Sequence, residues 1–153
     1  MRFLWFGKKK EKTSAAEVST PLPPVWSINN FVLVQSPLSN SVATDRSSSE
    51  IASFLSALVA PEAGPAELAL VEFLQERGVN KHELSQFSMK SDGARSAKVA
   101  DATLLLGSPE LIARATMPFH HEITAAIAAG ADRVFAIDAL VYAAFSLELS
   151  EVN

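Results

Sequence analysis

Residues 107–110 form a short motif whose backbone could bind a phosphate at the start of a helix. An apolar run at 103–106 stops at Gly107, and Ser108, Pro109 and Glu110 follow. Serine can cap a helix, proline suits the first helical position, and an acid complements the positive end of the helix dipole. A glycine between a strand and a helix often lets backbone approach a ligand, commonly a phosphate. The segment therefore predicts a strand, a glycine and a short helix at 108–115.

Histidine is the only residue type here that could provide nitrogen ligands to a metal. His120 and His121 are adjacent at the start of a helix predicted over 121–130, and His82 is isolated. Adjacent residues on a helix point about 100° apart, and a metal site needs several converging ligands. We expect surface or helix-capping histidines and no metal site.

The remaining polar residues give no catalytic pattern. Asp101, Asp132 and Asp138 fall at predicted turns or strand edges, where aspartate is common. No P-loop, dinucleotide fingerprint or nucleophile elbow is present. The sequence has no cysteine, which excludes disulfides and thiolate metal sites. No catalytic residue is predicted.

Composition and charge are those of an ordinary domain with one core. The 153 residues are 48% hydrophobic and 20% charged. Residues 1–12 carry a charge of +4, so the total of −4 leaves −8 for the rest, which argues against nucleic acid as a partner. No apolar window is long enough for a bilayer, and the lysines follow the first apolar residues instead of preceding them, unlike a signal peptide. We expect a cytoplasmic protein, with contact at the cytoplasmic membrane face as an option.

The first twelve residues, MRFLWFGKKKEK, combine aromatics with a basic cluster. Such a segment suits insertion at a membrane interface or docking into a partner's groove, and a disordered tail is the alternative. The candidate contact residues are Arg2, Phe3, Leu4, Trp5, Phe6, Lys8, Lys9 and Lys10. A polar, proline-rich linker runs from residue 7 to 24. We therefore divide the chain into 1–24, segment and linker, and 25–153, a single domain.

The domain alternates helical and strand periodicity. Helices are predicted at 47–60, where Ser47 and Glu50 form a capping box, and at 64–78, with Gly64 as cap, Pro65 in the first turn and Gly78 after the end. Strands are predicted at 31–35, 84–91, 95–99, 102–106, 133–138 and 141–149. Short connections between the strands favour an α+β fold, an antiparallel sheet with two helix pairs on one face.

Several segments together resemble one family. PEAGPAELALVEFLQERGV, FSMKSDGARSAKV, LLLGSPELI and AAGADRVFAIDALVYAAFSLE follow one another as in the nucleotide-binding domain of heavy-metal (copper-type) P-type ATPases. SVATDRSSSEIASFLSALVA is similar to the segment that opens that domain, and the resemblance covers about residues 41–148. It implies the fold of that domain. The family's Asp-Lys-Thr-Gly-Thr phosphorylation sequence is absent from the chain.

The resemblance also implies where a nucleotide would bind. In the family, a Glu-His-Pro motif holds the adenine, and a Gly-x-Gly and a third glycine let backbone approach the nucleotide. The matching positions here are Ala63, Gly64 and Pro65, then Asp92, Gly93 and Ala94, then Gly107. Alanine also stands at Ala102 and Ala139, which are glycine in many relatives. Only the proline and the third glycine keep the family's residues.

These replacements decide the predicted function. A millimolar site corresponds to about 4 kcal/mol, and two lost buried polar contacts at roughly 1–3 kcal/mol each remove most of it. Asp92 adds a charge of the same sign as a phosphate. We predict a non-catalytic interaction or scaffold module, an accessory subunit at a membrane or membrane protein complex, with no cofactor. The alternatives are a regulatory domain that binds ATP or ADP weakly and, from the transporter resemblance alone, a metal-sensing accessory protein.

Overall fold

One six-stranded antiparallel sheet organises the protein. A computed structural model describes residues 25–38 and 41–150. The strands, in spatial order β1-β6-β5-β4-β3-β2, are β1 (Val25–Leu33), β2 (Ser85–Met89), β3 (Arg95–Val99), β4 (Ala102–Gly107), β5 (Arg133–Ile137) and β6 (Leu140–Ser150). The predicted strand at 31–35 starts earlier, at Val25, and belongs to the same sheet. Residues 1–24, with the basic and aromatic segment, lie outside the described part.

Local capping signals set the helices. The helices are η1 (Val42–Thr44), α1 (Ser48–Val59), α2 (Pro65–Gln75), α3 (Pro109–Ala113) and α4 (His121–Ala129). Ser47 Oγ accepts from the Glu50 N–H at 3.1 Å and Ser108 Oγ from the Leu111 N–H at 3.3 Å, as predicted. In the described residues, no helix is long and apolar enough to cross a membrane.

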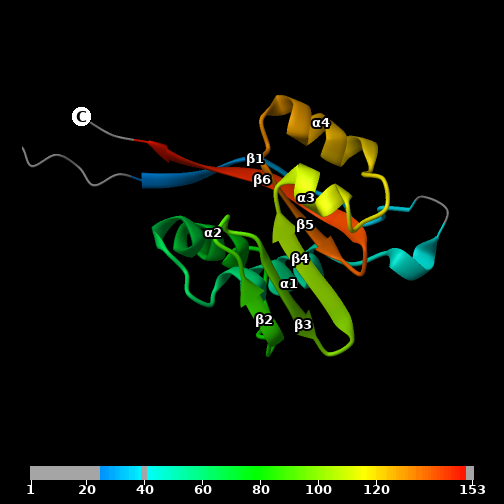
Figure 1. Cartoon of the computed structure of the whole chain (residues 1–153), viewed down its shortest axis with the longest axis horizontal. Helices are drawn as coiled ribbons and strands as arrows, with labels where there is room; N and C mark the ends of the chain where they lie inside the picture. Colours follow the sequence, from blue (N-terminus) through cyan, green and yellow to red (C-terminus); the bar gives the residue numbers. More distant parts are fainter. Residues whose placement is uncertain (1–24, 39–40, 151–153) are drawn as a thin grey trace, which may run out of the picture.

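The two helix pairs cover opposite faces of the sheet. α1 and α2 lie on one face of the sheet, and α3 and α4 lie on the other (Figure 1). Leu104, Leu106 and Phe135 pack with the first pair, while Ile112 and Ile123 belong to the cluster on the second face. The expectation of helices on a single face is therefore wrong. Alternate residues of a strand point to opposite faces, so the continuous apolar runs of β4, β5 and β6 supply a core on each side.

Tight turns join the central strands. Ala100, between β3 and β4, has φ 52°, and Asp138 and Ala139, between β5 and β6, have φ 52° and 70°. Positive φ at both central residues is the geometry of a type I′ hairpin. Ala139 thus adopts a conformation that favours glycine.

A polar network ties the segment before α1 to the last two strands. The buried Tyr142 hydroxyl donates to Thr44 O at 2.6 Å. Arg46 contacts Glu50 at 3.0 Å and Asp138 at 3.4 Å, and Asp138 Oδ1 accepts from the Thr103 N–H at 2.9 Å. Burial raises the pKa of Tyr142 above its ordinary value, with a smaller opposing effect of Arg46.

Candidate functional site

The Glu-His-Pro equivalent lies at the start of α2. Gly64 is the N-cap residue, and its N–H donates to Glu67 Oε1 at 3.0 Å. Pro65 occupies the first turn, as predicted, and is exposed, whereas Ala63 and Gly64 are half-buried. Neither Ala63 nor Gly64 has a polar side chain, so these two positions offer a ligand no polar side-chain contact.

The Gly-x-Gly equivalent forms the turn between β2 and β3. The Lys90 N–H donates to Ala94 O at 2.8 Å, and the Gly93 N–H donates to Lys90 O at 2.9 Å. Gly93 has φ +90°, which requires glycine or strains another residue. Asp92 Oδ1 accepts from the Ala94 N–H at 3.0 Å. The backbone N–H of Ala94, at the second glycine position of the motif, is therefore already bonded to the carboxylate of Asp92, at the first.

Gly107 lies where α3 packs closely on the sheet. A Cβ added there would lie 3.2 Å from Leu111 Cδ2, and 3.5 Å from both Ala94 Cβ and Ile112 Cδ1. Its φ is not in the left-handed region. Close packing against α3 and β3 thus accounts for the glycine. Because Arg95 pairs with Leu106, Ala94 and Gly107 are neighbours across β3 and β4.

Arg95 is a polar residue of this region that the sequence analysis missed. It is only 5% exposed, and its guanidinium donates to Leu58 O at 3.2 Å, to Pro61 O, and to Glu62 O at 3.5 Å. Leu58 lies in the last turn of α1, where a cation complements the helix dipole. Burial lowers the pKa of the Arg95 guanidinium, and the Glu67 and Glu62 carboxylates partly offset this effect. The side chain therefore fastens β3 to the loop that leads into Gly64.

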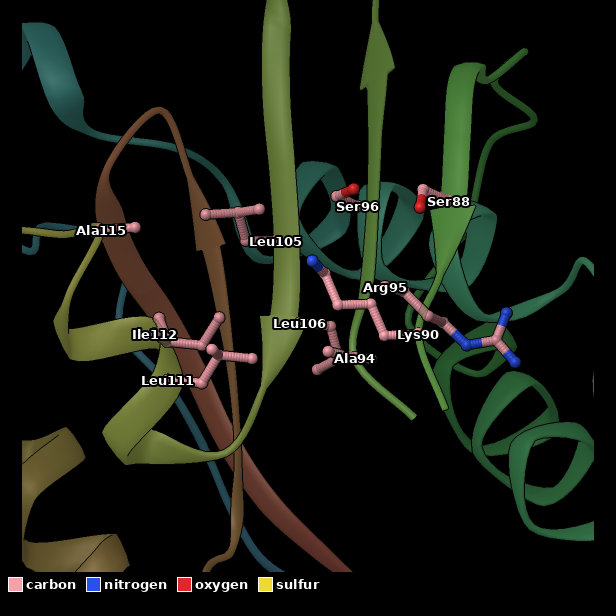
Figure 2. A pocket seen from close by; sticks show the side chains of 10 residues that line it. All are labelled: Ser88, Lys90, Ala94, Arg95, Ser96, Leu105, Leu106, Leu111, Ile112 and Ala115. Carbon is pink, nitrogen blue, oxygen red and sulfur yellow. The ribbon is translucent and has the colours of Figure 1, made fainter. Parts of the chain in front are cut away.

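A cavity of about 270 Å³ lies on the other side of β3, under α3. Figure 2 shows its ten lining residues, with the Arg95 guanidinium directed away from α3 toward the helices behind the sheet. The lining consists of Ser88, Lys90, Ala94, Arg95, Ser96, Leu105, Leu106, Leu111, Ile112 and Ala115. Of the positions matched to the family's motifs, the structure brings Ala94 to this cavity and Gly107 to its edge, while Gly64 caps α2 on the other face.

The adjacent histidines differ from the prediction. Their rings lie 4.2 Å apart, and ligand atoms of His120, His121 and Glu122 all lie within 4.8 Å of one another. The rings do not diverge because His120 precedes the helix: it is the N-cap of α4, and its Nδ1 accepts from the Glu122 N–H at 3.1 Å. The capping role is confirmed, and His82 packs edge-on against Phe54 at 4.7 Å. The absence of a metal site stays a prediction.

Comparison with known proteins supports the fold alone. No protein-family model and no curated protein sequence matches the chain. The N-domain of HMA6, a copper-transporting P-type ATPase, is similar with a TM-score of 0.59 at 16% identity, covering 82% of this chain and 98% of that domain. The N-domain of HMA8, also a copper-transporting P-type ATPase, has a TM-score of 0.57 at 11% identity, covering 80% and 98%.

Longer ATPase structures agree. The catalytic domain of the CPx-ATPase CopB-B matches with a TM-score of 0.53 at 17% identity, over 84% of this chain, which spans only 38% of that domain. A zinc-transporting PIB-type ATPase matches with a TM-score of 0.55 at 14% identity, and this chain spans 19% of its length. The resemblance found in the sequence is thus confirmed at the level of architecture: residues of this chain adopt the N-domain fold of copper-transporting P-type ATPases.

Proposed function

We propose that this protein is a non-catalytic interaction module that uses the N-domain fold without its nucleotide site. The observation that carries the proposal is the position of Arg95. Its guanidinium is bonded to three carbonyl groups between the end of α1 and the start of α2. The family's adenine-binding motif corresponds to the residues that immediately follow. Both terminal nitrogens of Arg95 are therefore already bonded to the loop that leads into these positions. Ala63 and Gly64 themselves have no polar side chain to contact an adenine.

The β2–β3 turn supports the same conclusion. The Ala94 N–H donates to Asp92. A nucleotide phosphate would compete with that carboxylate for the N–H group and would be repelled by its charge. At Gly64 the family's histidine is replaced by a residue with no side chain. Each loss is worth roughly 1–3 kcal/mol, against about 4 kcal/mol for a whole millimolar site.

Titration of the full chain with ATP and ADP, followed by amide NMR shifts, tests the proposal. We expect binding weaker than about 1 mM for both. The double variant Gly64→His/Ala94→Gly should regain measurable affinity if these positions correspond to the family's site. Saturable shifts of the unmodified protein at tens of micromolar, centred on Gly64 and Gly93, would contradict the proposal and favour the alternative, a weakly binding regulatory domain.

The module's location is proposed from residues 1–12. Their aromatics and lysines suit attachment to a membrane or to a membrane protein complex, as an accessory subunit on the cytoplasmic side. Full insertion of Trp5, Phe3 or Phe6 is worth about 1.5–3 kcal/mol each, whereas a lysine near an anionic surface adds about 1 kcal/mol and is screened by salt.

Fractionation of cell extracts distinguishes these contributions. Deleting residues 1–12 should release the protein from its membrane or complex. Trp5→Ala should weaken attachment at all salt concentrations, and replacement of Lys8, Lys9 and Lys10 mainly at low salt. Full retention of the deleted form would move the attachment surface to the domain itself.

A further inference from the structure

We propose that the cavity under α3 binds a small carboxylate with an apolar body, and that Lys90 is its counter-ion. This inference goes beyond the proposed function, because it concerns a small carboxylate and not a nucleotide. Of the positions matched to the family's motifs, only Ala94 is among the lining residues of the cavity.

The apolar side chains that form the floor and one wall of the cavity indicate that the ligand has an apolar part. Leu105 of β4 is half-buried, and Leu111 and Ile112 of α3 stand beside it, with Ala115 at the open end. The volume of about 270 Å³ is at the small end of ligand cavities. A short aliphatic chain or a single aromatic ring fits that size.

The register of the sheet explains why this space is open. Ser88 pairs with Ser96, and Ser96 pairs with Leu105. The next row runs from Lys90 to Ala94 and Gly107, where the two inner positions carry one methyl group between them. The small Ala94 side chain leaves the lysine stem free to lie over the sheet, whereas Leu111 and Ile112 of α3 pack over Gly107 and form one side of the space.

The charge of the ligand follows from Lys90. Figure 2 shows its side chain reaching across β3 toward β4 and Leu105. The lining contains two basic residues and no acidic one. Arg95 is already bonded to carbonyl groups, and across residues 25–38 and 41–150 Lys90 has no carboxylate within ion-pair distance. Asp92, in the same turn, bonds the Ala94 N–H but is not among the lining residues. The lining itself is therefore basic, and Lys90 is the cation available to the cavity.

The polar rim favours a carboxylate over a polyphosphate. The Ser88 and Ser96 hydroxyls stand on the same face as Lys90 and can donate to an oxygen. One lysine and two hydroxyls match a single negative charge. A triphosphate would lack further cations, and the nearby Ala94 N–H is already bonded to Asp92.

NMR titration of the full chain with hexanoate, and with hexanamide as the neutral match, tests the assignment. We expect saturable amide shifts centred on Ser96, Leu105 and Ala115, with hexanoate binding about tenfold more tightly than hexanamide. Lys90→Met should remove that preference, and Lys98→Met, a lysine of β3 that does not line the cavity, should keep it. Ala115→Phe places a ring at the exposed open end and should weaken both probes.

Three results would overturn the proposal: equal affinity for the two probes, an unchanged preference in Lys90→Met, or shifts that do not saturate. Both Lys90 and Ala115 are exposed, so thermal unfolding is expected to confirm that the variants fold. A parallel ATP arm separates the two proposals. ATP shifts around Gly64 would count against the non-catalytic function alone, while loss of hexanoate binding would count against this site alone.

Discussion

The two faces of the sheet are packed with side chains of different size. Under α1 and α2 lie Phe135, Tyr142 and Phe145, each at most 1% exposed, among Ile51 and the buried leucines of the two helices. Under α3 and α4 the buried strand residues include Ala136 and Ala144, and four of the nine members of that cluster are alanine. The first face is therefore packed with large side chains against the sheet, whereas the second is packed with small ones and has the cavity of about 270 Å³ beside α3. A second cavity, of about 470 Å³, is lined by residues of α1, α2 and the segment before β2. We expect substitutions in the first cluster to cost more stability than those in the second.

The largest expected effect comes from a matched pair of isoleucines. Ile51 of α1 and Ile123 of α4 are both 0% exposed. We expect Ile51→Ala to lower the free energy of unfolding by about 4 kcal/mol and Ile123→Ala by about 2.5 kcal/mol, since the cost grows with the cavity left behind. Urea unfolding of both variants measures the difference. Equal or reversed losses would remove the contrast between the faces.

Arg95→Met tests the polar bond that fastens β3 to the α1–α2 loop. Hydrogen bonds to charged groups contribute about 1.5–3 kcal/mol, and the three carbonyl groups lose their donor together, so we expect a loss of roughly 2–3 kcal/mol. Arg77→Met is the control. Arg77 also donates to a helix carbonyl, Phe73 O at 3.1 Å, but it is exposed and should cost under about 1 kcal/mol. Similar losses in the two variants would contradict a special role for Arg95.

Tyr142→Phe should have the smallest effect at neutral pH, about 1 kcal/mol for the bond to Thr44 O. Burial raises the pKa of Tyr142 above 10.0, so the unfolded chain ionises first. The stabilisation is complete below pH 10 and is lost as the pH rises through the folded-state pKa. Tyr142 is the one tyrosine in the sequence, so Tyr142→Phe removes tyrosine ionisation altogether. Between pH 7 and a pH above 10, the free energy of unfolding measured by chemical denaturation should therefore fall more in the unmodified protein than in Tyr142→Phe. An equal change in the free energy of unfolding with pH in the two proteins would contradict this prediction.

Local signals predicted most of the secondary structure. Ser47, Ser108 and Gly78 mark helix ends through contacts within a few residues, so their effect can be read from short windows of sequence. The distribution of helices over two faces was missed, although Leu104, Leu105 and Leu106 already put apolar side chains on both sides of β4. A strand of an antiparallel sheet with one solvent-exposed face would alternate apolar and polar residues, and β4 does not.

The candidate site was harder to predict because its main interaction is distant in sequence. Arg95 shares a strand face with Ala97 and Val99, which hinted that it is buried. Its partner Leu58 O is 37 residues away and is a backbone atom, for which no residue type gives a signal. The predicted divergence of the His120 side chain from that of His121 was wrong because it treated His120 as part of the helix. His120 is the N-cap, one residue before α4, so its side chain is not rotated by the angle between successive helical residues.

The place of β6 has a consequence for the order in which the protein folds. β6 lies between β1 and β5, and its Ser150 hydroxyl donates to Val25 O, 125 residues earlier. Both ladders that β6 forms therefore wait for a strand that the ribosome makes after the other five strands of the sheet. The β5–β6 ladder is a local hairpin, but pairing β1 with β6 closes a loop of more than a hundred residues, which is slow. Until it occurs, the nascent chain exposes the edge of β1. An unpaired edge can join another strand, so the interval before residues 140–150 emerge is when this chain most needs protection from aggregation.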